Sequence, residues 1–565
     1  MRNLIPGHAA YWLLATLVWL AAGCQAAPGA NSPSGAAQEG PAQPKVNRLN
    51  FGIAPPAIET NKVYITAVLN YWPLAPMYEF LIGVTPEGKE LVPQLATEWN
   101  LEPDGKSYRF KLKRGIPFHY GFGEMTAKDV RFVWEDMVGE KELLVGQLFG
   151  LANQIQDVEV VGDGEAVFKL PRPDAGFLSA ISQAENIYAI RSKADFAGRS
   201  RRAELTDKPY AATGPYQFLE RQQGQYVRYG RPPTNHWRQT PDFAEFEFRF
   251  MKEPSTNLAA LLAGEIHASA LPPELTEQGI KQGLRAIRSK SAGLHAFMSF
   301  YGVWINKRFR DVEVLNPDAS AQFVYPNSPM MDVRVRKALN KAIDRDALNK
   351  AFLGGKGDPI YNEFFHPNRL GWNPEWERRF KEAYGYDPEA AKKLLAEAGY
   401  GPGRPLTTTV RLAPSAFFPA VVDMDEAIAS QWRAVGVDVK LDQSDPAAMA
   451  AKQARVEYDN HAHVVITSIR QFLGATNYNG ALVRTGVQLP QLIDIYDQIN
   501  VTLDPKVADG LWRKWGDLGY EQYINAPLFW MPANASVNPK IVADYIYPGS
   551  IGGTYTHVEY IKAAK

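Results

Sequence analysis

The stretch LVPQLATEWNLEPDGKSYRFKLKRGIPFHYGFGEMTAKDVRF (91–132) carries the clearest fold signals in this 565-residue chain. The tripeptide PDG (103–105) provides a turn, and the apolar residues of SYRFKL (107–112) alternate with polar ones, so this part predicts a β-hairpin. Thr126 and Asp129 then form a capping-box-like pair at the start of a segment whose apolar residues recur at helical spacing. A hairpin followed by a capped helix predicts a mixed α/β protein.

Helices and strands continue to alternate along the rest of the chain. We expect a first strand in RLNFGIA (48–54), a second hairpin over 158–173, helices over 254–264, 332–348 and 387–400, a helix and then a strand over 424–442, and a strand over 458–469. Without its first segment the chain has about 540 residues, which is too many for one core. This length predicts two to four domains.

The composition excludes one class of partner. The 61 acidic and 61 basic side chains cancel, whereas nucleic-acid binding requires a surplus of Lys and Arg. Aromatic residues make up 12% of the chain and include 13 Trp and 26 Tyr. Most of these rings belong in a core, but so many amphipathic rings also suit a cleft that holds a small ligand.

Cys24 is the only cysteine, and it directly follows an apolar run. The run YWLLATLVWLAA (11–22) is too short to cross a bilayer but matches the apolar region of an export signal. LAAGC (20–24) resembles the lipobox of bacterial lipoproteins, although Ala21 stands where leucine is usual. The resemblance implies a signal peptide over 1–23 and a lipid on Cys24, and an ordinary secretory signal is the alternative.

The segment after Cys24 predicts a tether. Residues 25–44 are mostly small or polar and carry one charge, at Glu39, so we expect a flexible linker over 24–46. No later segment of the sequence is long and apolar enough to span a membrane. We therefore expect a lipid-anchored body on the periplasmic or extracellular face of a cell envelope.

Six segments together resemble the family 5 extracellular solute-binding proteins, the cargo receptors of ABC importers for oligopeptides, dipeptides, nickel complexes and some oligosaccharides. After the stretch that begins at Leu91 they are ATGPYQF (212–218), ALLAGEI (260–266), VRVRKALNKAIDRDAL (333–348), DPEAAKKLLAEAGY (387–400) and IASQWRAVGVDVKL (428–441). They occur in family order. The resemblance implies an α/β fold with two lobes, of the periplasmic-binding-protein type (type II, cluster C), and an extra inserted domain.

The resemblance also implies domain boundaries. We expect lobe I to comprise 47–84, 209–305 and 527–565, the inserted domain to comprise 85–208, and lobe II to comprise 306–526. Ligand would be enclosed between the lobes as they close about a hinge. A closed form can become dominant only if the ligand binds it more tightly than the open form.

Some positions depart from the family pattern. Tyr120 stands where Asp is frequent, His267 stands where Asp is usual, and about twenty residues (309–330) are added. The segment ITSIRQFLGATNY (466–478) lacks the Asp with which peptide-binding members often bind an α-ammonium group, and its only charge is Arg470. An oligopeptide-like solute is therefore one interpretation, and an oligosaccharide or a metal chelate is the alternative.

Aromatic walls and a few polar anchors are what such a receptor requires. The expected ligand-binding residues are Tyr71, Trp72, Tyr301, Trp304 and Trp372 as walls, Arg470 and Gln471 as anchors, and Phe472 beside them. Core packing is the competing interpretation for each ring. For Arg470, whose guanidinium suits a carboxylate, the alternative is a solvated position in a loop.

Catalytic and metal sites receive little support from the sequence. His461 and His463 alternate on a predicted strand, but two imidazoles alone make a poor metal site. Neither a G-x-S-x-G elbow nor an H-E-x-x-H helix occurs in the sequence. A glycosidase would need two carboxylates at a defined separation, which the sequence leaves open. We expect a protein without catalytic residues, metal or cofactor.

The expected function is that of a monomeric solute receptor whose partners are the permease and ATPase subunits of an ABC importer. The alternative is a surface sensor or adhesion module that keeps the fold without import. Neither function involves nucleic acid.

The lipid anchor leads to a direct prediction. Replacing Cys24 by Ser should move the protein from the membrane fraction to the soluble envelope fraction, because acyl chains hold it by burying methylenes at about 0.8 kcal/mol each. Cell fractionation with immunoblotting measures this. Retention of the variant in membranes would show that another feature anchors the chain.

Overall fold

The computed structural model describes residues 44–56, 58–61, 72–87, 90–139, 147–185, 187–197, 208, 210–290, 294–306, 320–367, 369–414, 418, 420–445, 448–449, 452–453, 455–468, 486–547 and 557–565. All of them belong to one unit, Ala42–Lys565. The predicted signal peptide, Cys24 and most of the linker lie outside the described residues. In these ranges none of the helices combines the length and the hydrophobicity that a bilayer crossing requires.

A seven-stranded sheet contains the first strand of this unit. In spatial order its strands are β12 (Arg285–Arg288), β19 (Asn534–Val537), β11 (Ala268–Ser269), β1 (Arg48–Ile53), β10 (Glu245–Phe250), β9 (Tyr226–Gly230) and β8 (Gln217–Gln222). β1 pairs in parallel with β10 and with β11. Leu49, Phe51 and Ile53 alternate along β1 and are buried, so the predicted first strand is confirmed.

A six-stranded sheet forms from later parts of the chain. Its strands are β14 (Asp358–Pro359), β18 (Asn525–Met531), β13 (Leu294–Tyr301), β17 (His461–Ser468), β15 (Thr407–Arg411) and β16 (Asp438–Asp442). β13 is central and pairs antiparallel with β17 and β18, whereas β15 pairs in parallel with β16 and β17. β16 and β17 confirm the two strands predicted over 424–442 and 458–469.

A four-stranded sheet contains both predicted hairpins. Its strands are β4 (Ala96–Leu101), β5 (Ser107–Leu112), β7 (Glu165–Lys169) and β6 (Asp157–Gly162). The turn between β4 and β5 places Gly105 at a positive φ of 71°, which glycine adopts without strain. Thr126 donates from both its backbone N–H and its hydroxyl to Asp129 Oδ2 at 2.9 Å, and helix α1 (Ala127–Gly139) begins there as the capping pattern predicts.

The remaining described elements are two small sheets and further helices. The small sheets pair β2 (Ile82–Val84) with β3 (Leu91–Pro93) and β20 (Val542–Tyr545) with β21 (Ile561–Ala563). The helices are α2 (Gln147–Gln154), α3 (Phe177–Ala180), α4 (Lys193–Phe196), α5 (Pro254–Ala263), α6 (Pro273–Lys281), α7 (Val333–Lys341), α8 (Arg345–Leu353), α9 (Glu375–Tyr384), α10 (Pro388–Glu397), α11 (Val421–Ala434), α14 (Pro490–Val501) and α15 (Pro505–Glu521), with short 3₁₀ turns at η3 (Trp72–Met77), η4 (His119–Gly121), η7 (Pro329–Met331) and η8 (Val558–Tyr560).

The single helix predicted over 332–348 is wrong. The structure has two helices there, α7 and α8, separated at residues 342–344. Asp344 has an extended backbone, and its side chain accepts a hydrogen bond from the Ala347 N–H at 2.9 Å. This carboxylate caps a new helix, and capping at that point outweighs the continuous apolar pattern.

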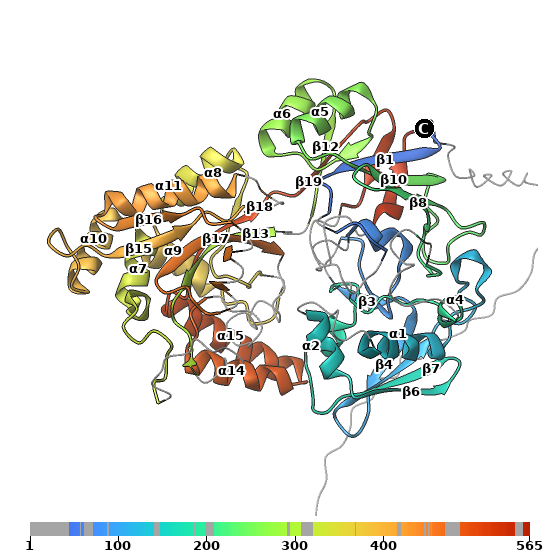
Figure 1. Ribbon diagram of the computed structural model, residues 1–565, viewed down its shortest axis with the longest axis horizontal. Coiled ribbons are helices and arrows are strands. Elements are labelled where there is room, and N and C mark those ends of the chain that lie inside the picture. The colour runs from blue at the N-terminus through green and yellow to red at the C-terminus, as the bar shows by residue number, and fades with distance from the viewer. Residues whose placement is uncertain are drawn as a thin grey trace, which may run out of the picture. The chain divides into compact units, whose positions relative to one another are not determined.

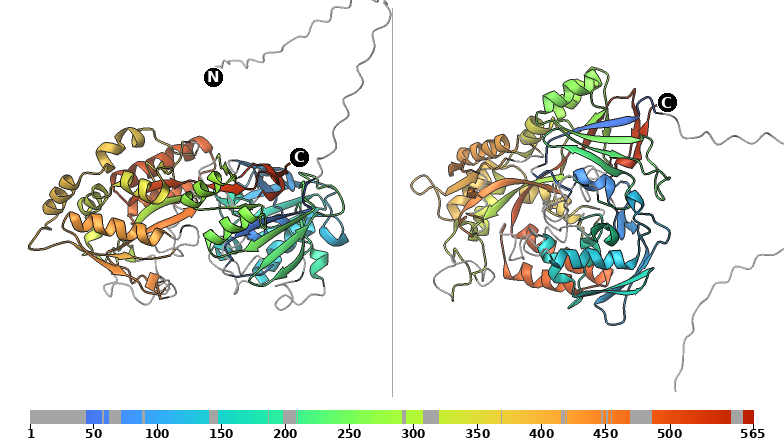
Figure 2. Two further views of the ribbon diagram at one scale, coloured as in Figure 1. Left: turned by 90° about the horizontal axis from the view of Figure 1, so that it is seen from above. Right: turned by 45° about the vertical axis from the view of Figure 1, so that its right-hand side comes forward.

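The two large sheets have separate hydrophobic cores. One core packs the seven-stranded and four-stranded sheets together, and the other surrounds the six-stranded sheet with α7, α11 and α15. Figure 1 shows these helices gathered around the six-stranded sheet. In the left view of Figure 2 the blue and green segments of the first half of the chain form one group and the yellow and orange segments form another. The described residues of the unit Ala42–Lys565 therefore form two bodies, each with a hydrophobic core of its own.

Within the described strands, the chain changes between the two large sheets twice. It leaves the seven-stranded sheet between β12 and β13, and it returns between β18 and β19. The labels of β18 and β19 lie side by side in Figure 1. Ser289 donates its backbone N–H to the carbonyl oxygen of Ala533 at 2.9 Å, so the two crossing segments are hydrogen-bonded to each other. A paired double crossing of this kind can bend as a hinge while it keeps both sheets in register.

Candidate ligand-binding site

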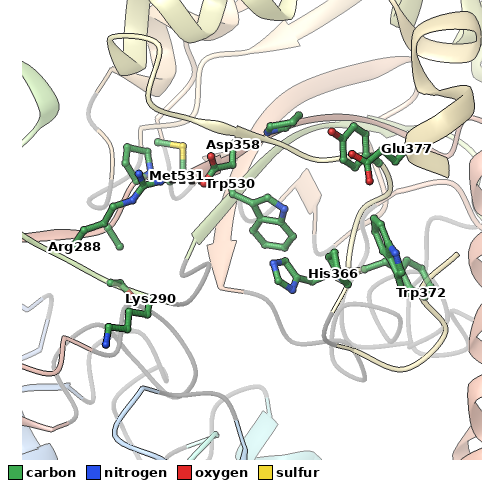
Figure 3. A pocket seen from close by; sticks show the side chains of 15 residues that line it. Arg288, Lys290, Asp358, His366, Trp372, Glu377, Trp530 and Met531 are labelled. Atoms are coloured by element: carbon green, nitrogen blue, oxygen red, sulfur yellow. Dashed lines mark hydrogen bonds and ion pairs between the residues drawn. The ribbon is translucent and has the colours of Figure 1, made fainter. Parts of the chain in front are cut away.

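A cavity of about 480 Å³ lies at the double crossing (Figure 3). One side is formed by the crossing segments themselves, residues 288–290 and 531–533. The other side is formed by β14, the strand end at Trp530, the loop that follows β14 and the start of α9. Its size lies within the range of small-molecule sites, about 300–1,000 Å³.

Aromatic rings form much of the wall. The His366 and Trp530 rings meet edge to face, with centroids 5.6 Å apart, and the centroids of Tyr361 and Trp372 are 6.4 Å apart. Phe365 also lines the cavity and is 1% exposed. Flat apolar surfaces of this kind bind planar or apolar groups through burial and ring stacking.

Local backbone geometry fixes the position of Trp372. The residue before it, Gly371, has a positive φ of 76°, and a Cβ there would lie 2.5 Å from Trp512 Cβ of α15. The Gly371 N–H also donates to Asp509 Oδ1 at 2.7 Å. Trp372 in turn packs perpendicular to the buried Trp376 at a centroid distance of 5.7 Å. Only glycine fits this approach, so the loop is held against α15 and its indole against α9.

A buried histidine on the neighbouring strand packs beside Trp530. His295 of β13 has no exposed surface, and its ring centroid is 5.4 Å from that of Trp530. Burial lowers the pKa of His295 to about 3, so it is neutral and packs as an aromatic ring at physiological pH. Trp530 of β18 is therefore packed against the central strand of the six-stranded sheet.

Four charged side chains line the cavity. Arg288 and Asp358 form an ion pair at 3.1 Å, and both side chains are mostly exposed, at 60% and 69%. Burial and the neighbouring Glu377 carboxylate raise the pKa of the Tyr361 phenol. Lys290 lies on the crossing segment and is exposed. The site thus combines rings with charges of both signs and can bind a polar small molecule that has an apolar part.

Comparison with known proteins identifies the family. The profile of bacterial extracellular solute-binding proteins, family 5 (middle region), matches residues 90–474. The chain belongs to this family. It is 28% identical to the dipeptide-binding protein of Escherichia coli K12 over 386 residues, which are 65% of this chain and 66% of that protein. The match therefore spans about two thirds of the length of that relative.

Solved structures of family members share the fold. NikA from Brucella suis, solved with Fe(III)-EDTA, superposes with a TM-score of 0.74 over 92% of this chain and 100% of its own, at 20% identity. DppA from Helicobacter pylori, solved with the peptide STSA, gives a TM-score of 0.68 over 92% of this chain and 98% of its own, at 21% identity. The predicted two-lobe α/β class is confirmed, and the inserted domain stays a prediction.

The predicted lobe boundaries of this family 5 protein can be placed on the described strands. The boundary at 305/306 falls after β13, and the boundary at 526/527 falls inside β18, although both strands belong to the six-stranded sheet. The four-stranded sheet falls within 85–208, as expected for the inserted domain, but shares a hydrophobic core with the seven-stranded sheet. The boundaries themselves stay predictions.

The structure places the predicted site residues in three situations. Trp372 lies on the cavity wall. Tyr301 and Trp304 have no exposed surface and pack perpendicular to each other, at 6.3 Å, in a separate small core. Trp72 begins the 3₁₀ turn η3, and nothing further of its side chain is described. Tyr71, Arg470, Gln471 and Phe472 lie outside the described residues. The ligand-binding roles of all eight stay predictions.

The two alternating histidines of β17 have no metal-binding neighbours in the part of the chain that is described. No group of three or more His, Cys, Asp or Glu side chains suited to a metal ion occurs in those ranges. His463 packs against Tyr301 at a centroid distance of 5.4 Å, and burial holds its pKa well below the usual range.

Several cavity residues were missed in the sequence. Trp530 lies in the uniformly apolar segment NAPLFWM, whose pattern predicts only a buried strand. One usable signal for a cavity ring is a proline just after it. A proline follows Trp530 in "WMP" (530–532) and His366 in "HP" (366–367), as one follows Trp72 in "YWP" (71–73). Because proline ends strand pairing, a ring just before it lies at a strand end or in a loop, where ligands bind.

Burial distinguishes the predicted rings experimentally. Trp304→Ala should reduce the free energy of unfolding by about 3–5 kcal/mol because it empties a fully buried position. Trp372→Ala should reduce it by about 1–2 kcal/mol because that ring is partly exposed on the cavity wall. Urea denaturation followed by circular dichroism measures both. Equal losses for the two variants would contradict the assignment of one ring to the core and the other to the wall.

Proposed function

We propose that this family 5 protein is an extracytoplasmic receptor of an ABC importer. It captures an oligopeptide-like or related small solute between its two lobes and delivers it to a membrane permease. The observation that carries the proposal is the aromatic cavity built on the double crossing between the lobes. The receptor's task requires selective binding and a change of shape, and neither requires a catalytic group.

The position of the cavity couples binding to hinge bending. Its walls come from both crossing segments and from the six-stranded sheet, so a rotation of one lobe changes the distance between Lys290 and the rings at His366 and Trp530. A solute that contacts both sides therefore binds one hinge angle better than another. A ligand shifts a conformational equilibrium only through such a difference in affinity.

Two of the described contacts between the lobes are weak. Lys356 pairs with Glu277 of α6, and their side chains are 42% and 50% exposed. Ala175 donates its N–H to the Asn500 carbonyl oxygen at 2.7 Å. Exposed ion pairs contribute about 0–1 kcal/mol each. Bound solute can thus outweigh them.

A peptide-like cargo is supported by the sequence match to a dipeptide-binding protein. A metal chelate is the second candidate, because NikA from Brucella suis shares the fold and was solved with Fe(III)-EDTA. Such a ligand would be bound through the carboxylates of the chelator rather than through protein ligands to the metal. Sensing without transport would use the same cavity.

The location follows from the family and from the first residues of the chain. Family 5 is a family of extracellular proteins. The proposal adds an export signal over 1–23 and a lipid on Cys24, so that the receptor is held at the membrane surface beside its permease. Anchoring of this kind raises the local concentration of receptor near the permease.

The test is a binding screen on the purified protein. Short peptides, oligosaccharides and metal chelates are added in turn, and the melting temperature is read by differential scanning fluorimetry, with native mass spectrometry to confirm stoichiometry. One class, expected to be the peptides, should stabilise the fold by about 2.7 kcal/mol at a hundredfold excess over Kd. If no member of the three classes binds, the receptor proposal is contradicted.

A further inference from the structure

A largely buried group of charged side chains fixes the segment 557–565 to the body built on the seven-stranded sheet. It consists of Glu79, Arg238 and Glu559 and is called the acid–arginine cluster below. We propose that this cluster is a proton-dependent lock, which holds the segment 557–565 most tightly in mildly acidic medium and loosens as the medium becomes alkaline. The lock lies outside the ligand cavity and does not depend on which cargo binds there.

Arg238 joins two carboxylates that are far apart in the chain. Its Nε and Nη2 donate to Glu79 Oε1 at 3.1 and 3.0 Å, and its Nη1 donates to Glu559 Oε1 at 2.5 Å. Glu79 follows η3 and has no exposed surface, and Glu559 lies in η8 and is 2% exposed. One guanidinium therefore serves two carboxylates that have almost no contact with solvent.

The loop between β9 and β10, which carries the arginine, also holds the segment 557–565 at a second point. Asp242 of this loop accepts hydrogen bonds from the Ala563 N–H at 2.9 Å and from Lys562 Nζ at 3.3 Å. The Lys562 and Asp242 side chains are 42% and 21% exposed, so their ion pair contributes little. Of these two attachments, the ionic contact that is out of solvent is the one through Glu559.

The cluster has one negative charge in excess if both carboxylates are ionised. An uncompensated buried charge is costly, and two neighbouring carboxylates retain a proton to higher pH than one alone. Glu559 is bonded to Arg238 and also lies 3.2 Å from His557 Nδ1. Glu79 Oε2, by contrast, is buried without a hydrogen-bond partner among the described residues. A charge on that oxygen would be unsolvated, so the proton belongs on Glu79.

The ionisation of the two acids agrees with this geometry. Burial and the Glu559 charge raise the pKa of Glu79 from 4.5 to about 7, although Arg238 and the Trp237 indole oppose the shift. Burial also acts to raise the pKa of Glu559, but Arg238 and His557 outweigh it and lower this pKa to about 2. Because the folded form raises the pKa of Glu79, its contribution is complete below about pH 4.5 and is lost as the pH rises through about 7.

The other titratable groups around Glu79 do not supply the missing positive charge. His236 Nε2 lies 3.4 Å from Glu79 Oε1 and 2.9 Å from the Thr213 carbonyl oxygen, and burial lowers the pKa of His236 to about 4. His557 Nε2 is buried and has no hydrogen-bond partner in the described ranges, so a charged ring would leave one N–H unpaired. Three further groups that affect this region are His119, Tyr216 and Tyr560. Burial lowers the pKa of His119 to about 4 as well, so this ring is also neutral.

Hydrogen exchange with mass spectrometry tests the lock on the full chain in detergent. Protection factors of a peptide that covers 557–565 are measured from pH 5 to pH 9, after correction for the intrinsic exchange rate at each pH. The wild-type protection factor should fall about tenfold per pH unit between pH 5 and pH 7 and become constant above about pH 8, because opening releases one proton. A protection factor that stays constant from pH 5 to pH 9 would overturn the proposal.

Variants locate the proton. Glu79→Gln, which imitates the protonated acid, should keep its pH 5 protection at every pH, and Glu559→Gln should move the fall to lower pH because Glu79 then has Arg238 to itself. Glu274→Gln, a control at an exposed acid of α6, should follow the wild type, and His557→Gln should retain the fall. If Glu79→Gln keeps the wild-type fall, or if His557→Gln abolishes it, the role of Glu79 is overturned. Failure of Glu79→Gln to fold at pH 5 would also contradict it.

Discussion

The structure depends on one constraint, which is that the chain joins its two large sheets through two short crossings that are hydrogen-bonded to each other. The bond from the Ser289 N–H to the Ala533 carbonyl, at 2.9 Å, continues the pairing of β12 with β19, and beyond it β13 pairs with β18. The two bodies therefore share a narrow connection, while each keeps its own core. A ligand cavity at this connection is lined by residues of both crossing segments.

The balance of energies follows from this arrangement. Burial inside each core holds the individual bodies together, whereas exposed ion pairs such as Arg288–Asp358 add little between them. The hinge angle thus depends on contacts between the two bodies, and a bound solute that adds contacts of its own can change it. Moving a hinge from 1:99 to 99:1 takes about 5.5 kcal/mol of preference for one form. A few charge-assisted hydrogen bonds and one buried ring can supply this amount.

Local patterns in the sequence predicted the fold well, and long-range relations were less accessible. The Thr126–Asp129 cap and the Gly105 turn depend on residues within a few positions, and both are present in the structure. The helix break at Asp344 was missed because its apolar spacing continues across the cap. Depth was left open, since core packing was the alternative for both Trp304 and Trp372, and the structure places one in a core and the other on a wall. Trp530 and Lys290 come together only because two crossings far apart in the chain are adjacent in space.

The central claim is that solute binding at the double crossing changes the angle between the two lobes. Single-molecule FRET tests it most directly, with dyes on Leu219→Cys in β8 and Leu441→Cys in β16, which are exposed positions at 45% and 37%, in a Cys24→Ser background. We predict a second FRET population that grows with the concentration of a stabilising solute and saturates with the Kd measured by calorimetry. A FRET efficiency that stays constant at saturating solute would contradict the account.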